Sequence, residues 1–101
     1  MFKYYILKDK KVIGIDDVIE WGKEFGNSNR IIKQETLPDG NFVSTVFLGI
    51  DYNFSDKGKP LLFETMVFPQ RGNYLDKYME RYSTYEEAEA GHKRIVEQFT
   101  N

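Results

Sequence analysis

The sequence predicts an α+β domain in which a single antiparallel sheet of four to six strands carries two helices packed on one face. Two patterns predict this class. Several runs rich in β-branched and aromatic residues are separated by turn residues, and two segments place apolar residues at helical spacing behind N-capping residues. A chain of 101 residues is too short for two independent cores, so we expect one domain over residues 1–101.

The N-terminal third is predicted to hold a hairpin and a short helix. Residues 2–7 and 12–15 are strand-like runs on either side of the polar residues 8–11. Asp16 or Asp17 then offers an N-cap, and apolar residues follow at helical spacing until Gly26 and Asn27 supply a stop.

The middle of the chain is predicted to form three neighbouring strands. Residues 30–37 and 42–51 flank a turn at residues 38–41, where Pro and Gly suit a hairpin connection. Both faces of the strand over 42–51 are largely apolar, which favours a central strand covered on both sides. We place residues 61–68 antiparallel to it, after a polar loop.

The C-terminal third is predicted to contain a loop over residues 69–77 and a short strand over 79–82, with a helix over 74–82 as the alternative. A second helix follows, capped by Ser83 or Thr84, with Glu86 or Glu87 completing a capping box. The full predicted order is β-β-α-β-β-β-(β)-α. The sheet face away from the helices is expected to be apolar at Val43, Phe47 and Met66, which suits a homodimer interface or a ligand surface.

Composition excludes several classes of function. The formal net charge of −2 gives no general attraction to nucleic acid, and no apolar run approaches the roughly 20 residues that span a bilayer. The chain has no Cys, so we expect a cytoplasmic protein without disulfides or a thiolate metal site, and the first residues do not resemble a signal peptide. It also lacks nucleotide-binding and nucleophile-elbow motifs, and we expect no cofactor and no metal.

The strongest candidates for chemistry are Asp51, Glu64 and His92. If the strands over 42–51 and 61–68 pair beneath the last helix, two carboxylates and an imidazole could meet in one pocket and serve acid–base catalysis or metal binding. The alternative is structural: Glu64 pairs across the sheet with Lys33 or Arg30, Asp51 caps a turn, and His92 packs with one hydrogen bond. The structural interpretation is favoured, so the sequence leaves open whether the protein is an enzyme and leans toward a protein that is not one.

A second set of residues has the composition of a binding surface. Two loops are rich in aromatic residues, Met and Arg, which are enriched at protein interfaces. The residues expected to bind a partner are Tyr52, Phe54, Arg71, Tyr74, Tyr78 and Met79. Gly91 lies inside the last predicted helix, where it costs about 1 kcal/mol relative to Ala; we expect it to permit close packing on the sheet.

Three blocks carry a resemblance to a known group of proteins: residues 43–49 (VSTVFLG), 62–68 (LFETMVF) and 82–92 (YSTYEEAEAGH). In this order and spacing they resemble a family of small uncharacterised proteins of tailed bacteriophages and prophages. The likeness spans roughly the last 60 residues, and the first 30 match only loosely. It implies a phage origin and a site of action in the cytoplasm of the infected cell, but no mechanism.

These observations lead to three functional hypotheses. The first is a phage accessory protein that binds a host or defence protein. The second is a sponge that binds a small nucleotide-like ligand through aromatic stacking. The third and weakest is a small hydrolase or metal-dependent enzyme that uses Asp51, Glu64 and His92.

Overall fold

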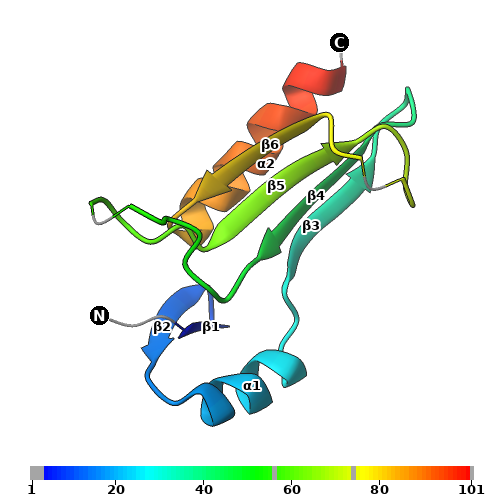
Figure 1. Cartoon of the computed structure of the whole chain (residues 1–101). Coiled ribbons are helices and arrows are strands. Elements are labelled where there is room, and N and C mark those ends of the chain that lie inside the picture. The colour runs from blue at the N-terminus through cyan, green and yellow to red at the C-terminus, as the bar shows by residue number, and fades with distance from the viewer. Residues whose placement is uncertain (1–3, 56, 74, 101) are drawn as a thin grey trace.

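The structure is a computed structural model that describes residues 4–55, 57–73 and 75–100 (Figure 1). Its elements follow the predicted order, and the short last strand forms in place of the helical alternative over 74–82. They are β1 (Tyr4–Lys8), β2 (Lys11–Ile15), α1 (Val18–Asn27), β3 (Ile31–Thr36), β4 (Phe42–Phe47), β5 (Phe63–Phe68), β6 (Tyr78–Tyr82) and α2 (Tyr85–Thr100).

The strands form two sheets, so the prediction of a single sheet is wrong. Strands β3, β4, β5 and β6 make a four-stranded antiparallel sheet in sequence order, and β1 pairs with β2 in a separate hairpin. The predicted strand over 42–51 ends early, at Phe47, because Gly49 takes a positive φ of 76° and turns the chain. The hairpin reaches this turn through an isolated bridge between Tyr4 and Ile50.

The two helices pack on different sheets, which corrects the expectation that they share one face. The indole of Trp21 on α1 donates a hydrogen bond to the carbonyl of Tyr5 at 2.9 Å, and its ring lies 5.1 Å from that of Tyr4. Helix α1 thus lies against the hairpin, whereas α2 runs along one face of the four-stranded sheet (Figure 1).

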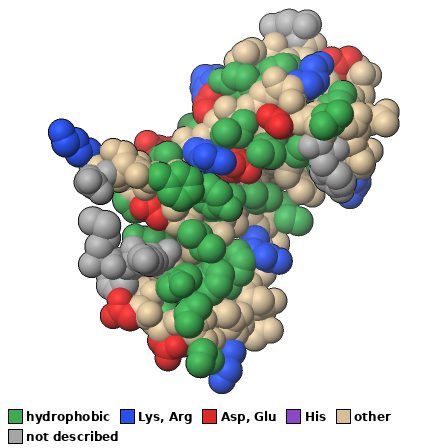
Figure 2. Space-filling model, viewed as in Figure 1, with side chains coloured by type: hydrophobic (Ala, Val, Ile, Leu, Met, Phe, Trp, Pro, Cys, Tyr) green, Lys and Arg blue, Asp and Glu red, His purple; other side chains and the backbone are tan. Residues whose placement is uncertain are grey.

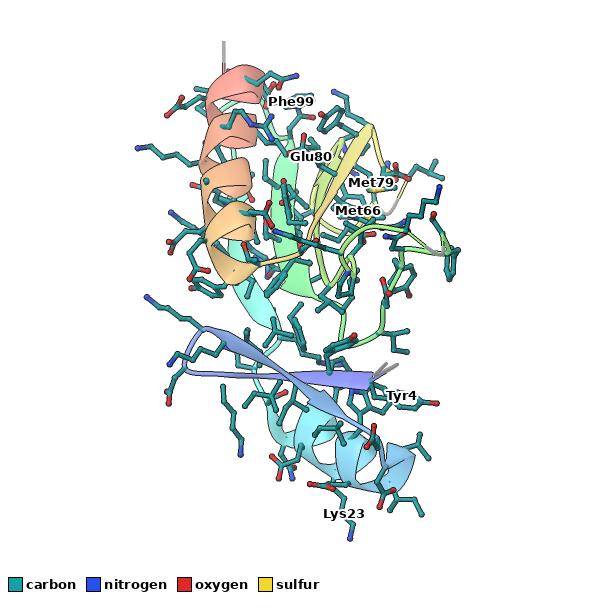
Figure 3. All side chains as sticks on the ribbon, turned by 90° about the vertical axis from the view of Figure 1, so that its left-hand side faces the viewer. Tyr4, Lys23, Met66, Met79, Glu80 and Phe99 are labelled. Atoms are coloured by element: carbon teal, nitrogen blue, oxygen red, sulfur yellow. The ribbon has the colours of Figure 1, made fainter. Side chains whose placement is uncertain are left out.

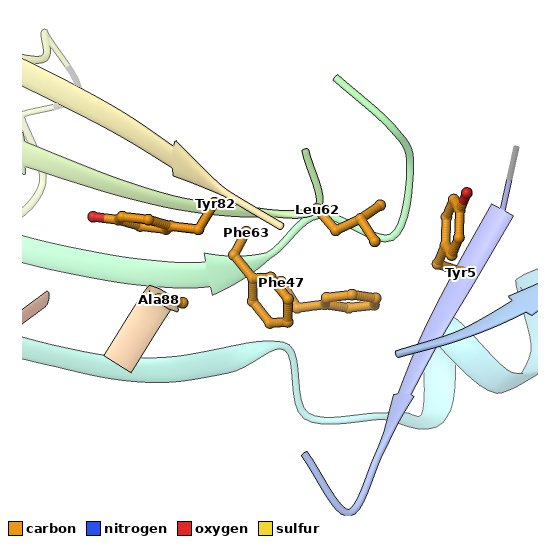
Figure 4. Close-up of a cluster of buried hydrophobic side chains, with 6 residues drawn as sticks. All are labelled: Tyr5, Phe47, Leu62, Phe63, Tyr82 and Ala88. Carbon is orange, nitrogen blue, oxygen red and sulfur yellow. The ribbon is translucent and has the colours of Figure 1, made fainter. Parts of the chain in front are cut away.

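Side chains alternate along the sheet, so every second residue of β4 and β5 faces α2. Val43, Phe47 and Phe63 are buried on this side, in clusters that include Ala88 and Ile95 of α2. Figure 4 shows one cluster continuing past Leu62 to Tyr5 of the hairpin. The expectation that Val43 and Phe47 line the face away from the helices is therefore wrong.

Both helices begin at the predicted caps. The carboxylate of Asp17 accepts hydrogen bonds from the amides of Ile19 and Glu20 at the start of α1. At the start of α2 the hydroxyl of Thr84 accepts from the amide of Glu87, and the Glu87 carboxylate accepts in return from the Thr84 amide, each at 3.1 Å. This is the predicted capping box, and it provides acceptors for two backbone amides at the start of α2.

Candidate functional site

The structure does not bring Asp51, Glu64 and His92 together. His92 extends from α2 toward one face of the sheet, while Glu64 lies on the opposite face, among the residues that line a groove there. Asp51 lies beyond the end of β4, and its carboxylate accepts hydrogen bonds from the amides of Asn53 and Leu61, at 2.7 and 2.9 Å. Asp51 thus shapes its loop, and the three side chains share no pocket.

His92 belongs to a buried polar chain that joins α2 to the sheet. Its Nδ1 lies 2.6 Å from Thr45 Oγ1, which lies 2.5 Å from Thr65 Oγ1, and its Nε2 lies 2.7 Å from Glu35 Oε1. A hydroxyl, an imidazole and a carboxylate in this order resemble the arrangement that activates a nucleophile. Thr45 is fully buried, however, so no substrate can reach its hydroxyl, and the chain serves to hold the helix on the sheet.

Beside this polar chain, Tyr82 of β6 packs closely against Gly91 of α2. A Cβ atom on Gly91 would lie 2.4 Å from three atoms of the Tyr82 side chain, so the predicted close approach at Gly91 is confirmed. Among the described residues the Tyr82 hydroxyl has no hydrogen-bond partner, and burial raises the pKa of Tyr82 to about 12. This side of the sheet is therefore closed by packing as well as by polar pairs.

The other face of the four-stranded sheet carries no helix within the described part of the chain. Cross-strand pairs on it match Phe42 with Phe68, Ser44 with Met66, and Met66 with Met79. Figure 3 shows Met66 and Met79 on the side away from α2, and Figure 2 shows apolar side chains gathered across this face. It is hollowed into a groove of about 270 Å³ lined by Gln34, Phe42, Ser44, Val46, Glu64, Met66, Phe68 and Arg71. We call this side of the four-stranded sheet, with its groove, the uncovered face.

Two arginines lie over aromatic rings at the uncovered face. Arg81 donates from Nε to Glu64 at 2.8 Å, while its guanidinium lies 4.7 Å from the ring centre of Tyr52. Arg71 lies 5.4 Å from the ring centre of Phe42. The expected pairing of Glu64 with Lys33 or Arg30 is thus replaced by a pair with Arg81, which its strand register places opposite Glu64.

Most of the residues predicted to bind a partner border the uncovered face. Tyr52 lies beneath Arg81 and touches the ring of Phe54, whose side chain is 87% exposed. Met79 lies on the face itself and is 39% exposed. Arg71 lines the groove.

One further predicted binding residue, Tyr78, does not lie on this face. Tyr78 points to the α2 side, where its ring contacts Phe99 at 5.7 Å between centroids. Tyr74 lies outside the described residues. We predicted neither Phe42 nor Phe68 as a binding residue. Phe68 and Met66 are alternate residues of one predicted strand, so the sequence pattern already places them on the same face.

Neither a metal site nor a known relative points to a function. Within residues 4–55, 57–73 and 75–100, no three His, Cys, Asp or Glu side chains form a group that could hold a metal ion. No helix in this part of the chain is long and apolar enough to cross a bilayer. Comparison with protein-family models, with curated proteins and with solved structures finds no match. The uncovered face is therefore the feature of the described chain on which a function can be proposed.

Proposed function

We propose that this protein is a binding protein that holds a protein partner on the uncovered face of its four-stranded sheet. The observation that supports this most strongly is that Met66 and Met79 lie side by side on a sheet face that no helix of the described residues covers. Methionine side chains there are flexible and polarizable, and Met, aromatic residues and Arg are enriched at protein interfaces. Met79 is 39% exposed and Met66 is half-buried, so apolar side chains on this face are accessible to a partner.

The loops at the two ends of the sheet extend this surface. Phe54 is 87% exposed and Leu75 is 79% exposed, and each lies in a loop that leads into or out of β5. Large apolar side chains at loop tips cost free energy in water, and a partner that covers them recovers it. The groove and these loop tips together offer a broad contact of the kind that protein partners use.

The alternatives of a small-molecule sponge and an enzyme have less support. The groove of about 270 Å³ is slightly below the roughly 300–1,000 Å³ of typical small-molecule pockets. The hydroxyl of Thr45, which His92 contacts, is sealed between helix and sheet. From the resemblance to phage proteins, we further propose that the partner is a host or defence protein in the infected cell.

Affinity capture with three versions of the full chain tests this proposal. Met79→Asp places a carboxylate on the uncovered face, and Ile19→Asp makes the same kind of change on α1, where Ile19 is 69% exposed. A specific partner should be captured from a bacterial lysate by the wild-type chain and by Ile19→Asp, and should be absent with Met79→Asp. Identical capture by all three versions would contradict the proposal.

A further inference from the structure

The charges in the groove indicate what kind of segment it accepts. Only two of the residues that line it are charged, Glu64 and Arg71. Glu64 is already paired with Arg81 at 2.8 Å. For Arg71, the described residues offer no carboxylate within ion-pair distance, and its guanidinium is held over the ring of Phe42. Within the described residues, the groove thus presents one positive charge without an ion-pair partner, beside the apolar side chains of Phe42, Met66 and Phe68.

We infer that the partner inserts an extended peptide segment with a carboxylate that pairs with Arg71 and an apolar side chain that rests on Met66 and Met79. This inference rests on the proposed function and names the chemistry of the partner. A guanidinium fixed on an aromatic ring keeps its N–H groups free to donate to a carboxylate, and such charge-assisted hydrogen bonds are the stronger kind.

The distance between neighbouring groove residues determines which positions of the bound peptide segment reach them. Phe68, Met66 and Glu64 are alternate residues of β5, so neighbours on this face are about 7 Å apart along the strand. An extended peptide repeats its own side chains at the same interval on one face. A carboxylate at the Arg71 end therefore places the residue two positions along over the methionine pair, where Met66 lies opposite Met79.

A second copy of the chain fits this groove less well. It would bring another Arg71 to the contact, while the one carboxylate among its groove residues, Glu64, is already engaged by Arg81. Single-stranded nucleic acid fits less well too, because binding it requires open aromatic platforms and excess positive charge. Phe42 and Phe68 are only 6% and 8% exposed, and the chain carries a net charge of −2.

Selection of random octapeptides displayed against the full-length chain tests the inference. The enriched sequences should contain Asp or Glu two positions from Leu, Ile, Met or Phe. The tightest of them should lose affinity about tenfold to a hundredfold with Arg71→Gln, as expected for the loss of a charge-assisted hydrogen bond. Arg30→Gln is the matched control, because Arg30 also lies over a phenylalanine, 4.5 Å from the ring centre of Phe25, but outside the groove.

The possible results separate this inference from the proposed function. Enriched peptides without acidic residues, or unchanged affinity with Arg71→Gln, would overturn the inference, and loss of binding with Met79→Asp would still uphold the proposed binding face. Peptides that bind Met79→Asp as tightly as wild type would count against both. An empty selection, a dimer that Met79→Asp dissociates, or binding of a mixed-sequence single-stranded RNA that Met79→Asp abolishes would each overturn the peptide inference.

Discussion

The two faces of the four-stranded sheet are built from the same strands but differ in how they are packed and paired. Toward α2, Val43, Thr45 and Thr65 are fully buried, and the polar groups among them are hydrogen-bonded through His92 to Glu35. On the uncovered face, Met66 and Met79 remain partly open to water, and the groove holds Arg71, which forms no ion pair with the described residues. Within the described residues one face is packed against α2, and we propose that a partner covers the other.

This difference separates residues that stabilise the fold from residues available to bind. Changes to the buried residues of the α2 side should reduce stability, because these side chains pack against one another and their polar groups are hydrogen-bonded within the chain. Changes to exposed side chains of the uncovered face, such as Met79, should leave stability nearly unchanged and alter binding.

The largest effect is expected where an aromatic side chain is removed from the closed face. Phe63 is fully buried and contacts the rings of Phe47 and Tyr85. Phe63→Ala should lower the free energy of unfolding by about 3–5 kcal/mol, the range for truncating a buried phenylalanine and leaving a cavity in its place. Chemical denaturation followed by tryptophan fluorescence measures it. Phe54→Ala is the control, since a side chain that is 87% exposed should change stability by less than about 0.5 kcal/mol.

A methyl group added between α2 and the sheet should be the next most damaging change. Gly91→Ala forces a Cβ to within 2.4 Å of Tyr82, and overpacking of this kind costs about 1–3 kcal/mol. Gly22→Ala in α1 meets nothing within 4 Å and should instead stabilise by up to about 1 kcal/mol through helix propensity. The midpoint of thermal unfolding should therefore fall for Gly91→Ala and rise for Gly22→Ala. Equal shifts of the two midpoints would contradict the close contact at Gly91.

The buried polar chain gives a prediction of similar or smaller size. Thr45→Val keeps the shape of the side chain but leaves His92 Nδ1 and the Thr65 hydroxyl without their shared partner, which should cost about 1–3 kcal/mol. Ser44→Ala, one residue away on the uncovered face, removes only the acceptor for the Gln34 amide and should cost less than about 0.5 kcal/mol. A larger loss for Ser44→Ala would reverse the roles assigned to the two faces.

Tyr82 adds a dependence on alkaline pH. Its pKa is raised from 10 to about 12 in the folded chain, chiefly by burial, so the folded state holds this proton more tightly than the unfolded state does. The stabilisation is complete below pH 10 and is lost as pH rises from 10 to about 12. Between pH 10 and about 12, the free energy of unfolding should fall more steeply with pH for the wild-type chain than for Tyr82→Phe. Identical slopes would show that the Tyr82 hydroxyl is as free to ionise in the folded chain as in the unfolded one.

The sequence predicted the elements well because their signals are local. The capping residues Asp17 and Thr84 with Glu87 mark both helix starts, and the turn at residues 38–41 marks the hairpin of β3 and β4. The division into two sheets was missed because it depends on where β4 ends. The turn at Gly49, which fits against Phe25 of α1, is a contact between distant segments that periodicity does not record.

The candidate site was predicted only in part, for a related reason. The sequence predicted that His92 packs with a hydrogen bond, but its partners Thr45 and Glu35 lie 47 and 57 positions away and look like ordinary strand residues. Glu64 was grouped with His92 although it alternates with Phe63 and Thr65, and only the placement of α2 on one face shows that this alternation separates them.

The most direct test of the contrast between the faces is a paired measurement on Met79→Asp: its free energy of unfolding and its capture of the partner that the wild-type chain binds. We expect the free energy of unfolding of Met79→Asp to lie within about 0.5 kcal/mol of the wild-type value, because Met79 is 39% exposed. We also expect this variant to lose the partner. A drop of several kcal/mol would show that this face is part of the folded core, and retained capture would show that the partner binds elsewhere.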